Sequence, residues 1–363
     1  MFRHRQAGLR WRSGAVLVFA AVVISGTGSQ AVARSSAAES PGTVWVANEG
    51  GNSLSAIDAS SNRVVATLTG IGMAHNVQVA PGGATVWAVS HTGMLAAVID
   101  ARSLRLLGYV GTGTEPAHVI VTPNGMTAYV TNSGGDTLTA IDTARRKVVA
   151  TIATGHFPHG IRPSPDGRWL YVANMKGGSV SVISVAHNRQ VARIPVGESP
   201  VQVAFAPDGR SVYVSLNGAN AVAKIDVATR RVVAQTHVGN GPVQVYVTPD
   251  GRYLLVANQG TPDLPGRTLT VIATSTFKQV ATVETGLGAH GVVVDPTSRF
   301  AYVTNVYGGT VAVVDLRLLR TTAHIRVGKE PNGISFSTLT VQRPAGTVLK
   351  LALPTMASMP GMG

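Results

Sequence analysis

A five-residue motif of strand character occurs seven times along the chain. It reads VWVAN at 44–48 and AYVTN at 128–132, and the same letters AYVTN return at 301–305. The first six copies start 42 residues apart, and the seventh starts 47 residues after the sixth, with the five extra residues near TPDLPG at 261–266. A fixed period of this length indicates a fold built from repeated structural units.

Each period contains four short segments that favour strands. After AYVTN of the third period come TLTAID at 137–142, KVVATI at 147–152 and PHGIRPS at 158–164. Apolar and β-branched residues alternate within the segments and turn-forming residues separate them, which is typical of short strands joined by tight turns. One four-stranded sheet cannot cover both its faces, whereas sheets arranged around an axis cover one another. The sequence therefore predicts an all-β fold, a seven-bladed β-propeller with four antiparallel strands per blade.

The phase of the repeat predicts how the ring closes. The first period opens directly on TVWVAN at 43–48, whereas PNGISFS at 331–337 has the character of an innermost strand but no motif after it. We expect this C-terminal strand to complete the N-terminal blade, so that the propeller spans 43–337. Residues 338–363 are expected to form a C-terminal tail whose end, from residue 345, adds nothing to stability.

Seven such motifs in phase resemble the YVTN-repeat, or YncE-like, family of exported seven-bladed β-propeller proteins. The resemblance covers nearly all of the chain that follows the N-terminal segment. It implies the fold more than the function, because propellers of this kind include binding proteins, surface proteins and cofactor-associated proteins. The haem-d1 propellers have eight blades, against seven repeats here.

The N-terminal segment has the organisation of an export signal. Four arginines precede the apolar run GAVLVFAAVVISG, and small residues at Ala31 and Ala33 mark a cleavage point after Ala33. The run is shorter than the ~20 residues of a spanning helix, so an uncleaved anchor is the alternative. We expect a signal peptide at 1–33, a linker at 34–42 and no transmembrane domain after cleavage. The protein would then be exported, that is secreted, cell-surface or periplasmic.

Cysteine content and net charge restrict the function. The chain has no cysteine, which excludes disulfides, thiolate metal sites and covalently attached c-type haem. Its formal net charge of +13 favours an anionic partner: a small molecule, a polymer or a protein segment. Single-stranded nucleic acid would require aromatic stacking platforms on a basic groove, and Phe157, Tyr246 and Tyr307 are the candidates for them.

Histidines occupy equivalent positions of the repeat. The first strand of each propeller blade lines the central channel, and the loops that enter these strands surround one mouth. One residue after the usual proline, the repeats carry, in chain order, His75, Ala117, His159, Val201, Val243, His290 and Asn332. Imidazoles on one rim suit a transition metal, an anion or acid–base chemistry. The alternative is that each histidine caps a loop by bonding a backbone carbonyl.

Two more residues join this set. His118 stands one residue after the equivalent position, and Arg162 stands three residues after His159. A guanidinium near the axis suits a carboxylate or phosphate; the alternative is an ion pair with a channel glutamate, for which Glu115, Glu198 and Glu330 are available. The candidate ligand-binding residues are His75, His118, His159, Arg162, His290 and Asn332. A divalent metal is the cofactor such a set would hold, with His75, His159 and His290 as candidate ligands.

No nucleophile elbow, phosphate-binding loop or dinucleotide motif occurs in the sequence. The leading interpretation is therefore a non-enzymatic binding or scaffold protein that holds its ligand or partner at the histidine-bearing mouth. A propeller enzyme of the lactonase or lyase kind is the alternative, with His159 or His290 as acid or base and Arg162 holding a carboxylate. Binding of single-stranded nucleic acid is the third. Met356, Met359 and Met362 could bind copper(I), but we expect a plain tail there.

Overall fold

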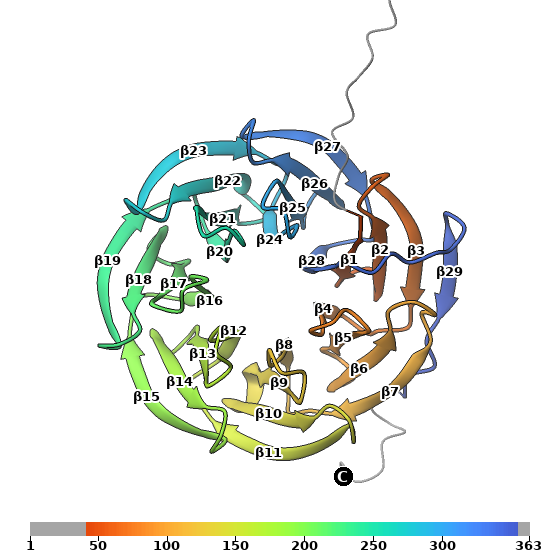
Figure 1. The fold of residues 1–363 in the computed structure, drawn as a ribbon, viewed down its shortest axis with the longest axis horizontal. Coiled ribbons are helices and arrows are strands. Elements are labelled where there is room, and N and C mark those ends of the chain that lie inside the picture. Colours follow the sequence, from red (N-terminus) through yellow and green to blue (C-terminus); the bar gives the residue numbers. More distant parts are fainter. Residues whose placement is uncertain (1–40, 355–363) are drawn as a thin grey trace, which may run out of the picture. The chain divides into compact units, whose positions relative to one another are not determined.

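The computed structural model describes residues 41–354, which form seven β-sheets arranged around a central axis (Figure 1). The whole expected signal peptide, residues 34–40 of the expected linker and the three tail methionines lie outside the described residues. No helix within 41–354 is long and apolar enough to cross a membrane. The elements are β1 (Thr43–Asn48), β2 (Ser53–Asp58), β3 (Arg63–Thr69), β4 (Ala74–Val79), β5 (Thr85–Ser90), β6 (Leu95–Asp100), β7 (Leu106–Gly111), β8 (Pro116–Val121), β9 (Thr127–Asn132), η1 (Ser133–Gly135), β10 (Thr137–Asp142), β11 (Lys147–Ala153), β12 (Pro158–Pro163), β13 (Trp169–Asn174), β14 (Ser179–Ser184), β15 (Arg189–Pro195), β16 (Pro200–Phe205), β17 (Ser211–Leu216), β18 (Ala221–Asp226), β19 (Arg231–His237), β20 (Pro242–Val247), β21 (Tyr253–Gly260), β22 (Pro265–Ala273), β23 (Lys278–Glu284), β24 (Ala289–Val294), β25 (Phe300–Asn305), β26 (Thr310–Asp315), β27 (Arg320–Arg326), β28 (Pro331–Ser337) and β29 (Thr347–Lys350).

Each sheet is one blade of the predicted seven-bladed propeller. Six sheets have four strands in chain order, as in β4-β5-β6-β7, and the seventh has the order β28-β1-β2-β3-β29. The innermost strands, which surround the centre in Figure 1, are β4, β8, β12, β16, β20, β24 and β28. The five extra residues of the sixth repeat lengthen the β21–β22 hairpin, where Gly260 pairs with Pro265.

The predicted ring closure is confirmed. β28 pairs antiparallel with β1, with Thr43 opposite Ser337 and Val46 opposite Ile334. The chain's last repeat strand therefore completes the blade that its first strand begins, and backbone hydrogen bonds close the ring.

The motif asparagine joins the second and third strands of its blade to the loop that enters the blade. Asn132 is fully buried. Its Nδ2 donates to the hydroxyls of Thr137 and Thr139, each at 3.0 Å, and its Oδ1 accepts from the Gly113 amide at 3.0 Å. Asn48 and Asn174 make the equivalent three contacts in their blades. A buried amide that satisfies several partners explains why the motif ends on asparagine.

The hydroxyl residue before this asparagine joins neighbouring blades. Thr131 Oγ1 accepts from the His118 amide at 2.9 Å and donates to the His159 carbonyl at 2.8 Å. His118 lies on the innermost strand of the same blade, and His159 lies on that of the next blade. Two further blades repeat the bridge, through Ser215 to the Val243 carbonyl and through Thr304 to the Asn332 carbonyl. The threonine of the motif thus fixes the spacing of consecutive innermost strands.

Part of the expected C-terminal tail forms a strand that packs on the first blade, and we therefore expect residues 345–354 to add to stability. β29 pairs in parallel with the outer strand β3, with Val348 opposite Thr67. Val341 and Leu351 are buried in the core shared by the first two blades. The repeat count could not indicate this, because β29 belongs to no repeat and only extends a sheet whose edge would otherwise be exposed.

We expect Thr131→Val to lower the free energy of unfolding by about 2–4 kcal/mol, because the isosteric valine leaves a buried amide and a buried carbonyl without their partner. Urea denaturation measures the change. Thr151→Val is the matched control, since Thr151 is exposed on the outer strand β11. Equal stability of the two variants would contradict the bridging role.

We expect a chain ending at Pro344 to melt at a lower temperature than a chain ending at Pro354. The shorter chain loses β29 and the buried Leu351, and one buried leucine contributes about 1.5–3 kcal/mol. Thermal denaturation followed by circular dichroism compares the two. Identical melting temperatures would show that β29 does not stabilise the blade.

Candidate metal centre in the channel

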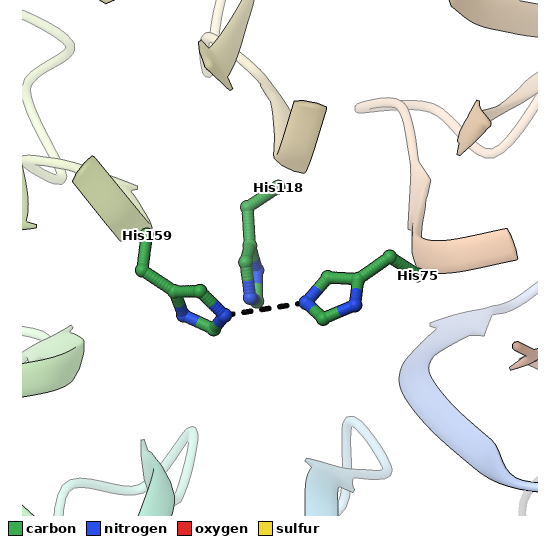
Figure 2. A group of neighbouring side chains, drawn as sticks. All are labelled: His75, His118 and His159. Carbon is green, nitrogen blue, oxygen red and sulfur yellow. Dashed lines mark hydrogen bonds between the residues drawn. The ribbon is translucent and has the colours of Figure 1, made fainter. Parts of the chain in front are cut away.

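Five of the six candidate residues lie at the beginnings of the innermost strands, whereas the sequence suggested the loops that enter these strands. His75, His159, His290 and Asn332 are the second residues of β4, β12, β24 and β28, and His118 is the third residue of β8. His118, His290 and Asn332 are buried. Figure 2 shows the imidazoles of His75, His118 and His159 converging from three strands.

A β-bulge in each of these strands directs the side chains. On β12, Pro158 pairs with Asn174 and Ile161 with Val172, so His159 and Gly160 together oppose one residue of β13. The same register shift occurs in β4, β8, β24 and β28. A bulge removes a residue from the regular ladder and re-aims its side chain. The repeated bulge thus places the candidate residues around the channel.

Glycine beside the histidines allows the innermost strands to approach one another. A Cβ on Gly160 would lie 2.5 Å from the Val201 carbonyl oxygen, and one on Gly333 would lie 2.6 Å from Asn76 Cα. Any side chain at either position would push neighbouring innermost strands apart. These two glycines therefore keep this end of the channel narrow enough for side chains from different blades to meet.

Three imidazoles form the centre of the cluster. The ring centroids of His118 and His159 are 4.7 Å apart, and that of His75 lies 5.6 Å and 5.3 Å from them. One nitrogen from each ring lies within 4.8 Å of the others. The shortest separation is 3.2 Å, between the Nε2 atoms of His75 and His159 (Figure 2).

The partners of the other ring nitrogens fix the tautomers of this close pair. His159 Nδ1 lies 3.2 Å from the Val201 carbonyl oxygen, which can only accept, so Nδ1 carries the proton. His75 Nδ1 lies 3.2 Å from a carboxylate oxygen of Glu49 and is likewise the donor. In the neutral rings both Nε2 atoms are therefore acceptors that face each other, and a cation between them would relieve the repulsion of their lone pairs.

Glu49 is a member of the cluster that the motif-based prediction missed. It follows Asn48 directly after β1, and it accepts a hydrogen bond of 2.6 Å from Asn332 Nδ2 as well as the one from His75. Burial would raise its pKa, but hydrogen bonds from His75 and Asn332 and the nearby imidazole charges lower it to about 2. The equivalent residue of the next repeat is His91, whose ring centroid lies 6.4 Å from that of His75. A comparison of residues directly after the motif could have found both.

Burial favours the neutral form of His118, His159 and His290. Desolvation, together with the charge of His75, lowers the pKa of His159 to about 3 and that of His290 to about 4. Desolvation and the charges of His159 and His75 lower the pKa of His118 well below its usual value. Neutral imidazole is the form that coordinates metal ions.

Several buried nitrogens around the cluster lack a hydrogen-bond partner among residues 41–354. They are His118 Nε2, His290 Nδ1, His91 Nδ1 and Gln244 Nε2. Most buried polar atoms in proteins are paired, and exceptions mark places where an ion, a water molecule or a ligand is bound. His118 Nδ1 has a weak contact of 3.5 Å with Gln202 Nε2. The cluster therefore has donor and acceptor capacity that the described protein atoms do not use.

Other predicted residues lie elsewhere. Arg162 is the fifth residue of β12 and lines a cavity at the end of the channel where the innermost strands finish. The predicted ion pair is not formed: within 41–354 no carboxylate pairs with Arg162, and Glu115, Glu198 and Glu330 are exposed.

The aromatic candidates for nucleic-acid stacking do not form one surface. Tyr246 lines the same cavity as Arg162, whereas Phe157 precedes β12 and Tyr307 follows β25, where the innermost strands begin. Phe157 carries Lys176 over its ring, with Nζ 4.1 Å from the centroid, and the Tyr307 hydroxyl accepts from Gln259 at 3.0 Å.

We expect the stability of the metal-free protein to fall as the pH is lowered from about 6.5 toward 4. The unfolded chain has histidine pKa values near 6.5, above the folded values of about 3 for His159 and 4 for His290, so protons bind the unfolded state preferentially. Each group then costs at most about 1.4 kcal/mol per pH unit. Urea denaturation in the presence of a chelator should show a shallower pH slope for His159→Gln/His290→Gln. His156→Gln is the control, because His156 is exposed and pairs with Asp136; equal slopes in all three proteins would contradict the burial effect.

Comparison with known proteins places the chain in a family. The model of a family described as YNCE-like beta-propeller matches residues 108–343. Hydrazine synthase of Kuenenia stuttgartiensis superposes with a TM-score of 0.67 at 24% identity, over 73% of this chain and 90% of that one. A functionally unknown protein of Desulfotomaculum acetoxidans superposes with a TM-score of 0.72 at 14% identity, over 81% of this chain and 98% of that one. A candidate 6-phosphogluconolactonase of Bacteroides fragilis superposes with a TM-score of 0.68 at 16% identity, over 82% of this chain and 98% of that one. These identities support a common fold alone, and a search of curated proteins found no match. The chain belongs to the YncE-like β-propeller family.

Proposed function

We propose that the chain is an exported β-propeller that binds one divalent transition-metal ion, Zn²⁺ or Cu²⁺, through His75, His118 and His159. One observation carries the proposal: the 3.2 Å separation of the His75 and His159 Nε2 atoms, both of which are acceptors. Two imidazole nitrogens on a tetrahedral ion, each ~2.05 Å from the metal, are about 3.3 Å apart. His118 supplies the third nitrogen, within 4.8 Å of the others. It takes the place that the sequence suggested for His290, which lies beside the three.

The surroundings of the three rings support this role. A carboxylate that accepts from the distal nitrogen of a ligating histidine fixes the tautomer and raises the basicity of the ring, and Glu49 stands in this relation to His75. The Val201 carbonyl does the same for His159. An all-imidazole set suits zinc and copper better than the hard ions calcium and magnesium, which prefer oxygen ligands.

When both rings are neutral, the gap between the two Nε2 atoms holds two lone pairs and no donor, and a metal ion there would be held by both. Protonated imidazole does not coordinate a metal ion. The affinity is therefore expected to fall as the pH is lowered.

The arrangement favours binding over hydrolysis. Three histidine ligands leave a coordination position open, as in catalytic zinc sites. A lactonase or lyase would also need a carboxylate free to act as a base near the ion. Glu49 is already held by His75 and Asn332, and its pKa of about 2 makes it a weak base. We therefore rank a metal-binding protein above an enzyme of the lactonase kind.

Export is consistent with this site. The arginines, the apolar run and the small residues before Ala33 support a cleaved signal. A site without thiolate ligands also keeps its donors in an oxidising compartment, where cysteine pairs would form disulfides.

We expect the tag-free protein, stripped with a chelator, to bind one equivalent of Zn²⁺ or Cu²⁺ in isothermal titration calorimetry. His75→Gln/His159→Gln should remove this binding, because it deletes both facing nitrogens. Glu49→Gln should weaken it about 10–100-fold, since the orienting charge is lost. Titrations at a series of pH values should show the affinity falling as the pH is lowered.

The matched control is His156→Gln, which removes an exposed histidine and should leave the affinity unchanged. Unchanged stoichiometry and affinity in the His75/His159 double variant would overturn the proposal, as would the absence of tight binding of either metal to the unmodified protein.

A further inference from the structure

A cavity of about 590 Å³ lies at the opposite end of the channel from the imidazoles. It is lined by the fifth and sixth residues of innermost strands, such as Arg162 and Pro163 of β12, and by the turns that follow them. None of the five histidine-cluster residues on the innermost strands lines it. The volume is within the range of sites for small organic ligands. The cavity is therefore separate from the candidate metal centre.

Arg162 is the one charged residue among those that line this cavity. Part of the wall is apolar, formed by Ile120, Phe205, Ile334 and Phe336, and the uncharged polar side chains of Gln78, Ser164, Ser335 and Thr338 line the rest. Five prolines complete the rim: Pro123, Pro163, Pro165, Pro249 and Pro296. A pocket that combines an apolar wall with a few placed polar groups is the usual form of a site that orients a small amphipathic ligand.

The guanidinium of Arg162 is not used by the fold. Its Nη1 donates to the Ile161 carbonyl at 3.0 Å, and within 41–354 it forms no other hydrogen bond and no ion pair. Burial lowers its pKa from the usual 12.5, although it remains a cation at neutral pH. The residues at the equivalent position of the other blades are uncharged: Gln78, Ile120, Ala204, Tyr246, Val293 and Ser335. The propeller thus needs no arginine here, and a desolvated cation without a counter-ion costs stability.

A second polar group lies in the same cavity. Tyr246, the fifth residue of β20, is half-buried and interacts electrostatically with Arg162. Burial raises the pKa of its hydroxyl, which stays protonated at neutral pH and remains available as a donor. An acceptor placed beside Arg162 could then receive hydrogen bonds from both side chains.

We propose that this cavity binds a small monocarboxylate with an apolar body, its carboxylate held by Arg162 and Tyr246 and its body against the apolar wall. A planar guanidinium matches a carboxylate through two parallel hydrogen bonds. One cation neutralises a monoanion, whereas a phosphate dianion would favour a second base, and Arg162 is the one basic side chain in the lining. This inference does not rest on the metal site proposed at the other end.

The probes are straight-chain carboxylates from acetate to decanoate, together with benzoate and phenylacetate. Hexanamide and phenylacetamide are their uncharged counterparts, and inorganic phosphate is a further competitor. Isothermal titration calorimetry should show carboxylates binding at least tenfold more tightly than the matching amides, with affinity rising as the chain lengthens to fill the cavity. Phosphate should not bind with comparable affinity.

Four variants separate the contributions. Arg162→Met should weaken carboxylate binding at least tenfold and leave amide binding unchanged. Arg162→Lys should restore only part of the affinity, because it keeps the charge and loses the planar fork, and Tyr246→Phe should cost several-fold. Arg168→Met is the matched control, since Arg168 is exposed in the turn after β12 and does not line the cavity. The His75→Gln/His159→Gln protein should bind carboxylates normally.

Thermal melting keeps the test decisive if Arg162 has a structural role. A melting temperature of Arg162→Met equal to or above that of the unmodified protein is expected, because a desolvated charge is replaced by an apolar side chain. A large drop would assign Arg162 to the fold and overturn the proposal. Equal binding of carboxylates and amides, tighter binding of phosphate, or undiminished binding by Arg162→Met would also overturn it.

Discussion

The hydroxyl bridge between consecutive blades is the interaction on which the rest of the structure depends. An innermost strand pairs with a neighbour on one side only, so its bulged backbone groups need partners from elsewhere. Thr131 supplies them by accepting from the His118 amide and donating to the His159 carbonyl. Thr304 links the Gly291 amide to the Asn332 carbonyl in the same way. The residues whose backbones are held by these bridges include those whose side chains form the cluster, so one set of bonds spaces the blades and aims the imidazoles.

Most of the fold could be predicted from the sequence, because the repeat period of the strand motif reflects how four-stranded sheets must pack. A sheet of four strands has two faces to cover, and seven in-phase copies leave one arrangement that covers them all. The missing first strand before Thr43 and the unmatched strand at 331–337 then determine how the ring closes, and β28 pairs with β1 accordingly. β29 could not be foreseen, since no periodicity predicts where a non-repeating segment will dock.

The candidate site was predictable in its composition but not in its geometry. His75 and His159 could be grouped from the sequence because they occupy the same position of two repeats, and equivalent residues of a closed propeller surround its central axis. The histidines lie on the strands, at a β-bulge that directs their side chains. The histidine positions alone did not indicate this bulge. Glu49 directly follows the motif of the first repeat, whereas His75 belongs to the loop position that follows the usual proline, so the comparison that grouped the histidines did not include it. Arg162 was grouped with the histidines because it is near in sequence, yet three residues of extended chain span about 10 Å, and it lies toward the other end of the channel.

The two ends of the channel favour ligands of opposite charge, and charged groups at one end interact electrostatically with those at the other. The charge of Arg162 contributes to the lowered pKa of His118, which means that the guanidinium also opposes any other positive charge placed near that imidazole. A carboxylate on Arg162 would neutralise this charge and make the imidazole cluster more favourable for a cation. Linkage requires the reverse effect to be equal in free energy, so a bound metal ion would favour an anion in the cavity. A cation held by the imidazoles and a carboxylate held by Arg162, the ligands proposed for the two ends, would therefore stabilise each other's binding.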